Sequence, residues 1–334
     1  MSDREDIDDA SSELAESLLE ADEEDARGQQ AANQNVEGDS MLLDLPPGMY
    51  EGIHPVSYHV RALGFVSKHA LDRIIAPKTP AHYHAWVTGL IPDEDTDAKF
   101  FGRAFHCASL ERDRYLKEFA IMPDFGELRA NARKGVTKEH GKRNKEARDA
   151  WRAEHRGRIH LSRTEGVKCD EMSASLRRHP EIAKLLDRGT FEVTLRFDDE
   201  ESGLPCKARP DWLATTYGAL LDLKSAEDAS IEAFERDAGK YAYHRQAAFY
   251  IDAMDAIGWP INDFVFGVVE KNPPYAAALY RLEPESGAAG REDNRIGMDR
   301  LAECCARNEW PGYPTGVQTA SLPRWKMRNF RGND

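Results

Sequence analysis

An aspartate and a lysine stand two residues apart in an otherwise apolar stretch, Ala-Leu-Leu-Asp-Leu-Lys-Ser, at residues 219–225. Successive side chains of a β-strand point to opposite faces, so Asp222 and Lys224 would share one face and the leucines beside them the other. A second carboxylate, Asp211, precedes this stretch across a hairpin expected near residues 217–218. Two antiparallel strands joined in this way would bring the two aspartates to the same end of a sheet.

Two carboxylates at one end of a sheet favour a hard divalent cation. Their oxygens, together with the backbone carbonyl of Leu223, suit Mg²⁺, which keeps several waters, and Mn²⁺ is the expected substitute. Lys224 could orient or deprotonate one such water for attack on a phosphodiester and offset charge on the phosphorus centre. Each preorganised electrostatic group of this kind contributes about 10²–10³ in rate. The pattern predicts metal-dependent phosphodiester hydrolysis, while an ion pair on an exposed edge strand has the same spacing.

Three further polar side chains occupy positions on expected helices. His106 falls on a helix expected over residues 98–110, where a satisfied core histidine is the alternative interpretation. Gln246 and Tyr250 stand one turn apart on a helix expected from residue 231 to residue 257. Tyr250 by itself also suits the core, but an amide on the apolar stripe of a long helix needs hydrogen-bond partners.

Together these residues resemble the core of the PDDEXK nuclease superfamily. The two aspartates and the lysine have the form D-(x)₁₀-D-x-K, in which an aspartate replaces the usual glutamate, as is typical of the RecB-like and RecE-like branch. The stretch Gly-Arg-Ala-Phe-His, which ends at His106, resembles that branch's G-x-x-x-H motif, and Gln-Ala-Ala-Phe-Tyr, from Gln246, resembles its Q-x-x-x-Y motif. The similarity covers about residues 50–330 and looks most like the RecE-type (exonuclease VIII) domain of prophages.

The resemblance implies a metal site. Asp211 and Asp222 would be the principal ligands, with the Leu223 carbonyl between Asp222 and the lysine. His106 would be a further ligand or a group directly beside the ligands. Glu192 points off the apolar face of an expected strand and is an additional acidic candidate, although an ordinary exposed strand residue is an equally good interpretation.

The resemblance also implies the activity. Lys224 would be the catalytic lysine, and Gln246 and Tyr250 would face the metal site and position that lysine or the DNA end. The expected reaction is 5′-to-3′ digestion of one strand of linear double-stranded DNA in phage-type recombination. The expected partners are further copies of the chain in a ring-shaped homo-oligomer and a single-strand annealing protein.

Two alternatives remain open at the level of sequence. One is a catalytically inactive module of the same fold that binds DNA ends or a partner protein. The other is a nuclease in another context, either an endonuclease or a CRISPR-adaptation nuclease. Relatives of the last kind usually carry a four-cysteine iron–sulfur cluster, and the five scattered cysteines do not match it. A P-loop, a G-x-S-x-G elbow and an H-E-x-x-H helix are all absent from the sequence.

Hydrophobic periodicity predicts an α/β (α+β) fold with a mixed central sheet flanked by helices, and the resemblance implies a restriction-endonuclease-like core. The first strand, over residues 191–197, is expected to be half-buried, because its apolar residues alternate with polar ones. Helices are expected over residues 67–75, 80–90, 98–110, 169–186, 231–257 and 298–308, and strands over residues 191–197, 205–213, 219–225, 264–269 and 275–282.

The net charge of -14 is unevenly distributed along the 334 residues. Nearly all of it falls on residues 1–44, which predicts a disordered acidic tail before a nuclease domain over residues 45–334. Residues 127–168 are strongly basic and predict a helical arm, either solvated or in contact with a phosphate backbone. The cationic and aromatic residues 322–331 could also touch nucleic acid.

The cellular location is expected to be the cytoplasm of a bacterium or its phage. The tail lacks a signal peptide's basic and apolar regions. The odd number of cysteines fits reduced thiols. No stretch of about 18 apolar residues is present, so no membrane span is expected.

Overall fold

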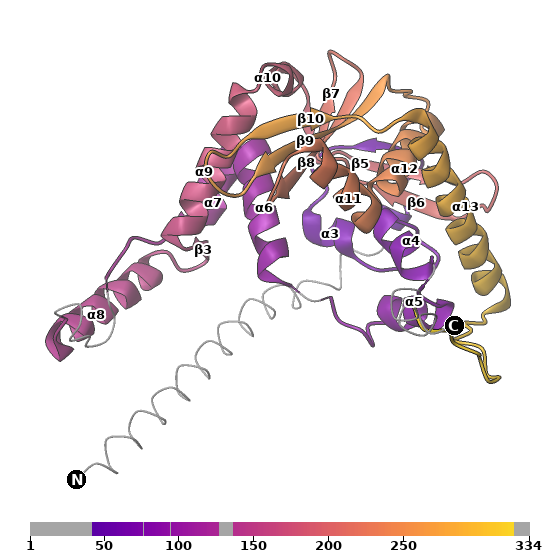
Figure 1. Ribbon diagram of the computed structural model, residues 1–334, viewed down its shortest axis with the longest axis horizontal. Helices are drawn as coiled ribbons and strands as arrows, with labels where there is room; N and C mark the ends of the chain where they lie inside the picture. The colour runs from indigo at the N-terminus through magenta and orange to yellow at the C-terminus, as the bar shows by residue number, and fades with distance from the viewer. Residues whose placement is uncertain (1–41, 76, 94, 127–135, 324–334) are drawn as a thin grey trace, which may run out of the picture.

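The structure is a computed structural model that describes residues 42–75, 77–93, 95–126 and 136–323 (Figure 1). In this part of the chain the main sheet is mixed and has five strands in the order β10-β9-β8-β7-β4. β8 and β9 run parallel, whereas the other neighbours are antiparallel. The predicted mixed α/β fold is confirmed. The five strands are β4 (Thr190–Phe191), β7 (Trp212–Ala214), β8 (Ala219–Ala226), β9 (Asp263–Glu270) and β10 (Ala277–Tyr280).

Two smaller sheets accompany the main one. The first has the order β1-β5-β6 and is antiparallel, and the second consists of the parallel pair β2 and β3. Their strands are β1 (Gly48–Tyr50), β5 (Thr194–Asp198) and β6 (Pro205–Ala208), and then β2 (Phe119–Ile121) and β3 (Ile159–Leu161).

β8 lies in the middle of the main sheet, between two apolar cores. Its alternation is as predicted, because Leu221 and Leu223 pack into one core and Leu220 packs into the other, on the face shared with Asp222. All three leucines are fully buried. A strand covered on both faces reads as a nearly continuous apolar run, and Asp222 interrupts that run at its centre.

Helices from two parts of the chain cover these cores. The core around Leu220 is closed by α4 (Lys68–Ile74), α5 (Pro80–Val87), α12 (Tyr243–Ala256) and α13 (Pro284–Arg307). The core around Leu221 is closed by α6 (Asp97–Leu110), α7 (Arg112–Glu118), α9 (Arg163–Arg178) and α10 (Pro180–Asp187). In Figure 1, α6 and α9 lie to the left of the main sheet, and α12 and α13 lie to the right. The short α3 (Pro55–His59) precedes them.

The strands predicted over residues 191–197 and 205–213 are each interrupted, at the same level of the hairpin. Pro210 has no N–H to donate to a ladder. Opposite the next residue, Asp211, Glu192 adopts a left-handed backbone conformation with φ of 45°, and its N–H donates to the Asp211 carbonyl at 3.0 Å. The hairpin therefore passes from the β5–β6 sheet into the β4–β7 pair through a bend, and local distortions of this kind re-aim side chains.

The expectation of a half-buried strand over residues 191–197 is also wrong. Thr194 and Arg196 are buried like their apolar neighbours. The cause is the segment before α4, which places Phe65 beneath the Arg196 guanidinium and Tyr58 beneath Arg209, the hydrogen-bond partner of Thr194. A second layer therefore covers the face that the pattern assigns to solvent.

Two of the predicted helices are divided and one is longer than predicted. Residues 231–257 form α11 (Ile231–Tyr241) and α12, separated by Ala242 in the left-handed region with φ of 55°. Residues 169–186 fall in α9 and α10, because Pro180 begins a new helix. The last helix, α13, begins at Pro284 rather than near residue 298, because Pro is favoured in the first turn of a helix.

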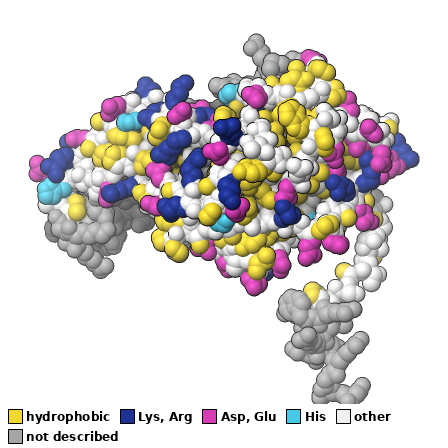
Figure 2. All heavy atoms as spheres, turned by 90° about the horizontal axis from the view of Figure 1, so that it is seen from above, with side chains coloured by type: hydrophobic (Ala, Val, Ile, Leu, Met, Phe, Trp, Pro, Cys, Tyr) yellow, Lys and Arg dark blue, Asp and Glu magenta, His cyan; other side chains and the backbone are white. Residues whose placement is uncertain are grey.

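Part of the basic segment forms the predicted helix, α8 (Lys138–Glu154), which projects from the body in Figure 1, whereas its end forms β3 and the start of α9. Only Gly141 is buried within α8. Figure 2 shows Lys and Arg side chains over this arm, mixed with acidic and apolar groups. Residues 127–135 of the segment lie outside the described residues, as do residues 1–41 of the acidic tail and most of the cationic run 322–331. No helix among the described residues is long and apolar enough to cross a membrane.

We expect Gly290→Ala to destabilise the fold. A Cβ atom at Gly290 would stand 2.3 Å from the His244 carbonyl oxygen, so α13 must move away from α12, at about 1–3 kcal/mol of unfolding free energy. Gly287→Ala in the same helix is the matched control, because its Cβ would meet nothing within 4 Å, and it should stabilise by about 0.5–1 kcal/mol. Urea unfolding measures both, and equal stability of the two variants would contradict the close helix contact.

Candidate active site

One group of hydrogen bonds joins β8 to α12. The Lys224 ammonium lies 2.5 Å from Oδ2 of Asp222 and donates to Oε1 of Gln246 at 3.1 Å. The amide of Gln246 in turn donates from Nε2 to Oδ1 of Asp222. Gln246 therefore bridges the acid and the base of the Asp-x-Lys pair, as the need of a helix amide for partners predicts.

A second group joins the bend of the hairpin to β8 and α6. Oδ2 of Asp211 accepts the Leu223 N–H at 2.8 Å and lies 3.4 Å from Nδ1 of His106. A strand residue directs its N–H and its carbonyl to the same edge, so the Leu223 carbonyl faces the side on which Asp211 lies. The structure thus gathers four elements around the end of the short strand β7.

The bend at Pro210 is what makes this meeting possible. β7 pairs with β8 only as far as Trp212 opposite Leu221. Beyond that point Asp211 leaves the ladder, and its side chain takes over the Leu223 N–H that an ordinary neighbouring strand would have bonded. A carboxylate replaces a backbone carbonyl at this position, so the ladder is completed and a charge is placed beside Asp222.

The two carboxylates experience opposite electrostatic environments. Burial raises the pKa of Asp222, and the charge of Asp211 adds to this against the lowering effect of Lys224, so the net shift is upward. Burial acts in the same direction on Asp211, but His106, Lys224 and the Leu223 N–H together hold its pKa below the usual value. Burial would lower the pKa of His106, yet the Asp211 carboxylate raises it overall.

Tyr250 lies one turn beyond Gln246 and is buried in the core around Leu220. Burial raises its pKa well above the ordinary value, which its hydrogen bond with Gln246 opposes. The hydroxyl is therefore placed to hold the Gln246 amide rather than to contact solvent. The role of Tyr250 in positioning the site stays a prediction, and Tyr250 would act by holding the Gln246 side chain in place.

The backbone of Glu192 is hydrogen-bonded to that of Asp211, but its carboxylate points toward two arginines. It lies 3.9 Å from Nη1 of Arg114 and 3.8 Å from Nη1 of Arg209. Its charge is thus matched by two arginines of the surrounding framework. Among the predicted metal ligands, Glu192 is the one whose contacts point to a structural role.

Sequence reasoning did not include Tyr243 in the site. The Lys224 ammonium lies 4.8 Å from the centre of the Tyr243 ring, a distance suited to a cation–π interaction. Tyr243 precedes Gln246 by three residues, which is one turn of the same helix. The three-residue spacing from Gln246 was a usable signal. However, a continuous helix was expected over residues 231–257, so nothing indicated that a second helix would begin at Tyr243.

The donor set fits Mg²⁺. Among the described residues, no group of three or more His, Cys, Asp or Glu side chains could hold a metal ion. Mg²⁺ does not need one, since it is commonly held by one or two carboxylates together with waters and substrate phosphates. Oδ2 of Asp222 is buried and accepts no hydrogen bond from the described residues, although Lys224 pairs with it by charge. A divalent cation would use that oxygen and relieve the repulsion between Asp211 and Asp222.

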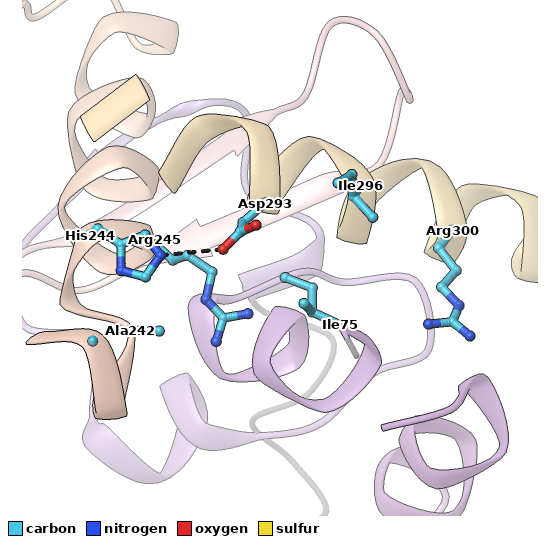
Figure 3. A pocket seen from close by; sticks show the side chains of 8 residues that line it. Ile75, Ala242, His244, Arg245, Asp293, Ile296 and Arg300 are labelled. Carbon is cyan, nitrogen blue, oxygen red and sulfur yellow. Dashed lines mark hydrogen bonds and ion pairs between the residues drawn. The ribbon is translucent and has the colours of Figure 1, made fainter. Parts of the chain in front are cut away.

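A separate pocket of about 370 Å³ opens beside the junction of α11 and α12 (Figure 3). The charged groups that line it already have partners within the protein. His244 pairs with Asp293 at 3.2 Å, Arg245 pairs with Asp72 at 3.2 Å, and Arg300 donates to a backbone carbonyl. The pocket contains none of the predicted site residues.

Comparison with known families identifies residues 70–321 as a PDDEXK-like domain of unknown function (DUF3799). The chain belongs to this family. The match spans more than half of the sequence and contains every predicted site residue. It confirms the predicted superfamily, while the RecE-type branch stays a prediction.

No curated protein matches the sequence. Two solved structures resemble this PDDEXK-like chain at 13% identity. A "Putative exonuclease" from Eubacterium rectale aligns over 81% of this chain and 94% of its own, with a TM-score of 0.49. A "phage related exonuclease" from Haemophilus somnus aligns over 55% of this chain and 92% of its own, with a TM-score of 0.29. At these TM-scores neither similarity bears on the activity.

We expect Gln246→Ala to destabilise the protein, because Asp222 and Lys224 both lose a buried partner. The loss of unfolding free energy should be about 1–3 kcal/mol. Asp252→Ala, which removes an exposed ion pair with Arg291 from the same helix, is the control and should cost less than about 1 kcal/mol. Urea unfolding without added metal provides the measurement, and a smaller loss for Gln246→Ala than for Asp252→Ala would contradict the bridging role.

Proposed function

We propose that the protein is a metal-dependent nuclease that hydrolyses phosphodiester bonds of linear double-stranded DNA from its ends. The observation that carries the proposal is the convergence of Asp211, Asp222 and Lys224 at the end of β7, with Gln246 bridging the last two. Membership of the PDDEXK-like family supports it independently.

Asp211, Asp222 and the Leu223 carbonyl would hold the cation, with His106 beside Asp211. When bound, Mg²⁺ would supply Lewis-acid stabilisation of the phosphoryl oxygens and lower the pKa of a coordinated water. His106 contacts Asp211 and fixes the orientation of that carboxylate. The Leu223 N–H donates to the same oxygen, Oδ2, and restrains it further.

Lys224 would act on the reacting groups directly. Its ammonium is restrained by Asp222, Gln246 and the Tyr243 ring, so it is held in place before the substrate arrives. It can orient the attacking water and offset the negative charge that develops on the phosphorus centre. A water oxygen would bond to phosphorus as that water gives up a proton to solvent, one phosphorus–oxygen ester bond would break, and the departing sugar oxygen would take a proton from solvent.

The basic segment supports a polyanionic substrate. Residues 127–168 carry 13 Lys and Arg against six Asp and Glu. Lys142 and most other cations of α8 are exposed, where charge attracts phosphates through solvent. We propose that this arm contacts the DNA backbone outside the cleavage site.

The resemblance to RecE-type domains supports the finer parts of the proposal. It predicts 5′-to-3′ digestion in phage-type recombination, a ring-shaped homo-oligomer that encloses the duplex, and transfer of the remaining strand to a single-strand annealing protein. It also predicts that residues 45–334 act as one nuclease domain in the cytoplasm, with the acidic tail outside it, and that Mn²⁺ substitutes for Mg²⁺.

We expect purified full-length protein to release nucleotides from linear duplex DNA in Mg²⁺ and to leave closed-circular duplex intact. EDTA should stop the release. Lys224→Ala should lower turnover by at least about 10²-fold, because a preorganised cation is removed from the reacting centre, while binding of DNA persists. Lys184→Ala, an exposed surface lysine on α10, is the control and should keep wild-type turnover.

Gel electrophoresis of labelled DNA and fluorescence anisotropy measure the two properties separately. If linear DNA stays intact with every divalent cation tested, the proposed nuclease activity is contradicted. If such a protein still binds DNA ends, it is the inactive binding module instead. Cleavage of closed circles would point to an endonuclease, and wild-type turnover by Lys224→Ala would refute the role of the lysine.

A further inference from the structure

Three aromatic rings form a ladder from the core to the surface beside Lys224. Phe266 on β9 is fully buried, and the Tyr243 ring stacks on it at 5.3 Å and 23°. Tyr241 stacks on Tyr243 in turn, at 6.0 Å and 24°. The Lys224 ammonium lies over the middle ring of this ladder.

The outermost ring is unusually accessible for an aromatic side chain in a stack. Tyr241 is 48% exposed, whereas Tyr243 is half-buried. The exposed Lys240 places its ammonium 4.8 Å from the centre of the Tyr241 ring. An exposed aromatic surface with an adjacent flexible cation combines the two features by which proteins bind single-stranded nucleic acid without reading sequence.

The backbone holds this ring in position. Tyr241 is the last residue of α11, and the left-handed Ala242 turns the chain before Tyr243 begins α12. Lys68 on α4 donates to the Tyr241 carbonyl at 3.2 Å and so fixes the junction from outside. The break between the two helices therefore lets the rings of Tyr241 and Tyr243 stack on each other. In a continuous helix they could not, because residues two apart do not face each other.

We infer that Tyr241, together with Lys240, forms a nucleobase-stacking subsite next to the phosphodiester that is cleaved at Lys224. The inference rests on the proposed nuclease function and names how that site holds a nucleotide. The centre of the Tyr241 ring can be no farther from the Lys224 ammonium than the sum of the Lys224–Tyr243 distance of 4.8 Å and the Tyr243–Tyr241 distance of 6.0 Å. With one base per about 3.4 Å along a strand, the stacked base belongs to a nucleotide within about three of the scissile phosphate.

The chemistry of the subsite determines what it accepts. A tyrosine face stacks on any base, so the subsite binds the end of a strand irrespective of sequence. A base must leave its paired stack to reach the ring, and the Lys240 ammonium, which lies over the ring, would then move to the adjacent phosphate. The subsite therefore favours a frayed or displaced strand end over paired duplex.

The test uses full-length protein and duplexes with one unpaired 2-aminopurine at positions one to four from either end. Ca²⁺ replaces Mg²⁺ so that binding is measured on DNA that a gel shows to be intact. Wild-type protein should quench the fluorescence of one of these positions. Tyr241→Leu should lose the quench and raise the dissociation constant about tenfold, the typical effect of removing one stacking contact.

Two further variants separate stacking from folding. Tyr241→Trp should keep both the quench and the affinity, since a larger aromatic face still stacks. Tyr217→Leu is the matched control, because Tyr217 is 46% exposed in the turn between β7 and β8, and it should behave as wild type. Melting temperatures show whether each variant is folded.

The outcomes distinguish this inference from the proposed function. Equal quench and affinity in wild type and Tyr241→Leu would overturn the subsite, whether or not Mg²⁺-dependent degradation occurs. A quench that depends on Tyr241, in a protein that degrades no DNA, would overturn the nuclease and leave the subsite. Absence of DNA binding by the wild type would overturn both.

Discussion

A carboxylate buried in the centre of a sheet requires partners, and the rest of the site supplies them. Asp222 is 1% exposed on a strand whose neighbouring leucines are fully buried on both faces. An isolated charge in such a place is strongly disfavoured. Lys224 from the same strand and Gln246 from α12 compensate this charge, and the contact with Gln246 fixes the position of α12 against β8. Oδ2 of Asp222, which pairs with Lys224 by charge but accepts no hydrogen bond from the described residues, is where a cation would bind.

Two departures from regular backbone deliver the other groups. The bend at Pro210 frees Asp211 from the ladder and lets its side chain bond β8. The left-handed Ala242 starts a new helix, whose first two turns carry Tyr243 and Gln246 to Lys224. A straight hairpin and a continuous helix would satisfy the hydrophobic pattern equally well, but they would not assemble these groups. The irregular positions are therefore where the fold and the proposed chemistry meet.

The parts that the sequence predicts well are those that local periodicity controls. The alternation in β8 places Asp222 and Lys224 on one face, and α4 lies within the helix expected over residues 67–75. The burial of Thr194 and Arg196 was not predictable in the same way, because a segment distant in sequence covers them. Tyr243 was missed for the related reason that its importance depends on a helix break. Hydrophobic periodicity predicts which face of a helix or strand a residue occupies, whereas tertiary contacts determine where the helix or strand ends.

The most direct test of this account is a calorimetric titration of the protein with Mn²⁺ in the absence of DNA. We predict one site per chain, whose affinity falls at least about tenfold in Asp222→Asn and in Asp211→Asn, since each loses a charged ligand. Asp252→Asn, which alters a carboxylate on α12 that pairs with Arg291, should bind as the wild type does. Equal Mn²⁺ affinity in all four proteins would contradict the claim that the two buried aspartates form the metal site.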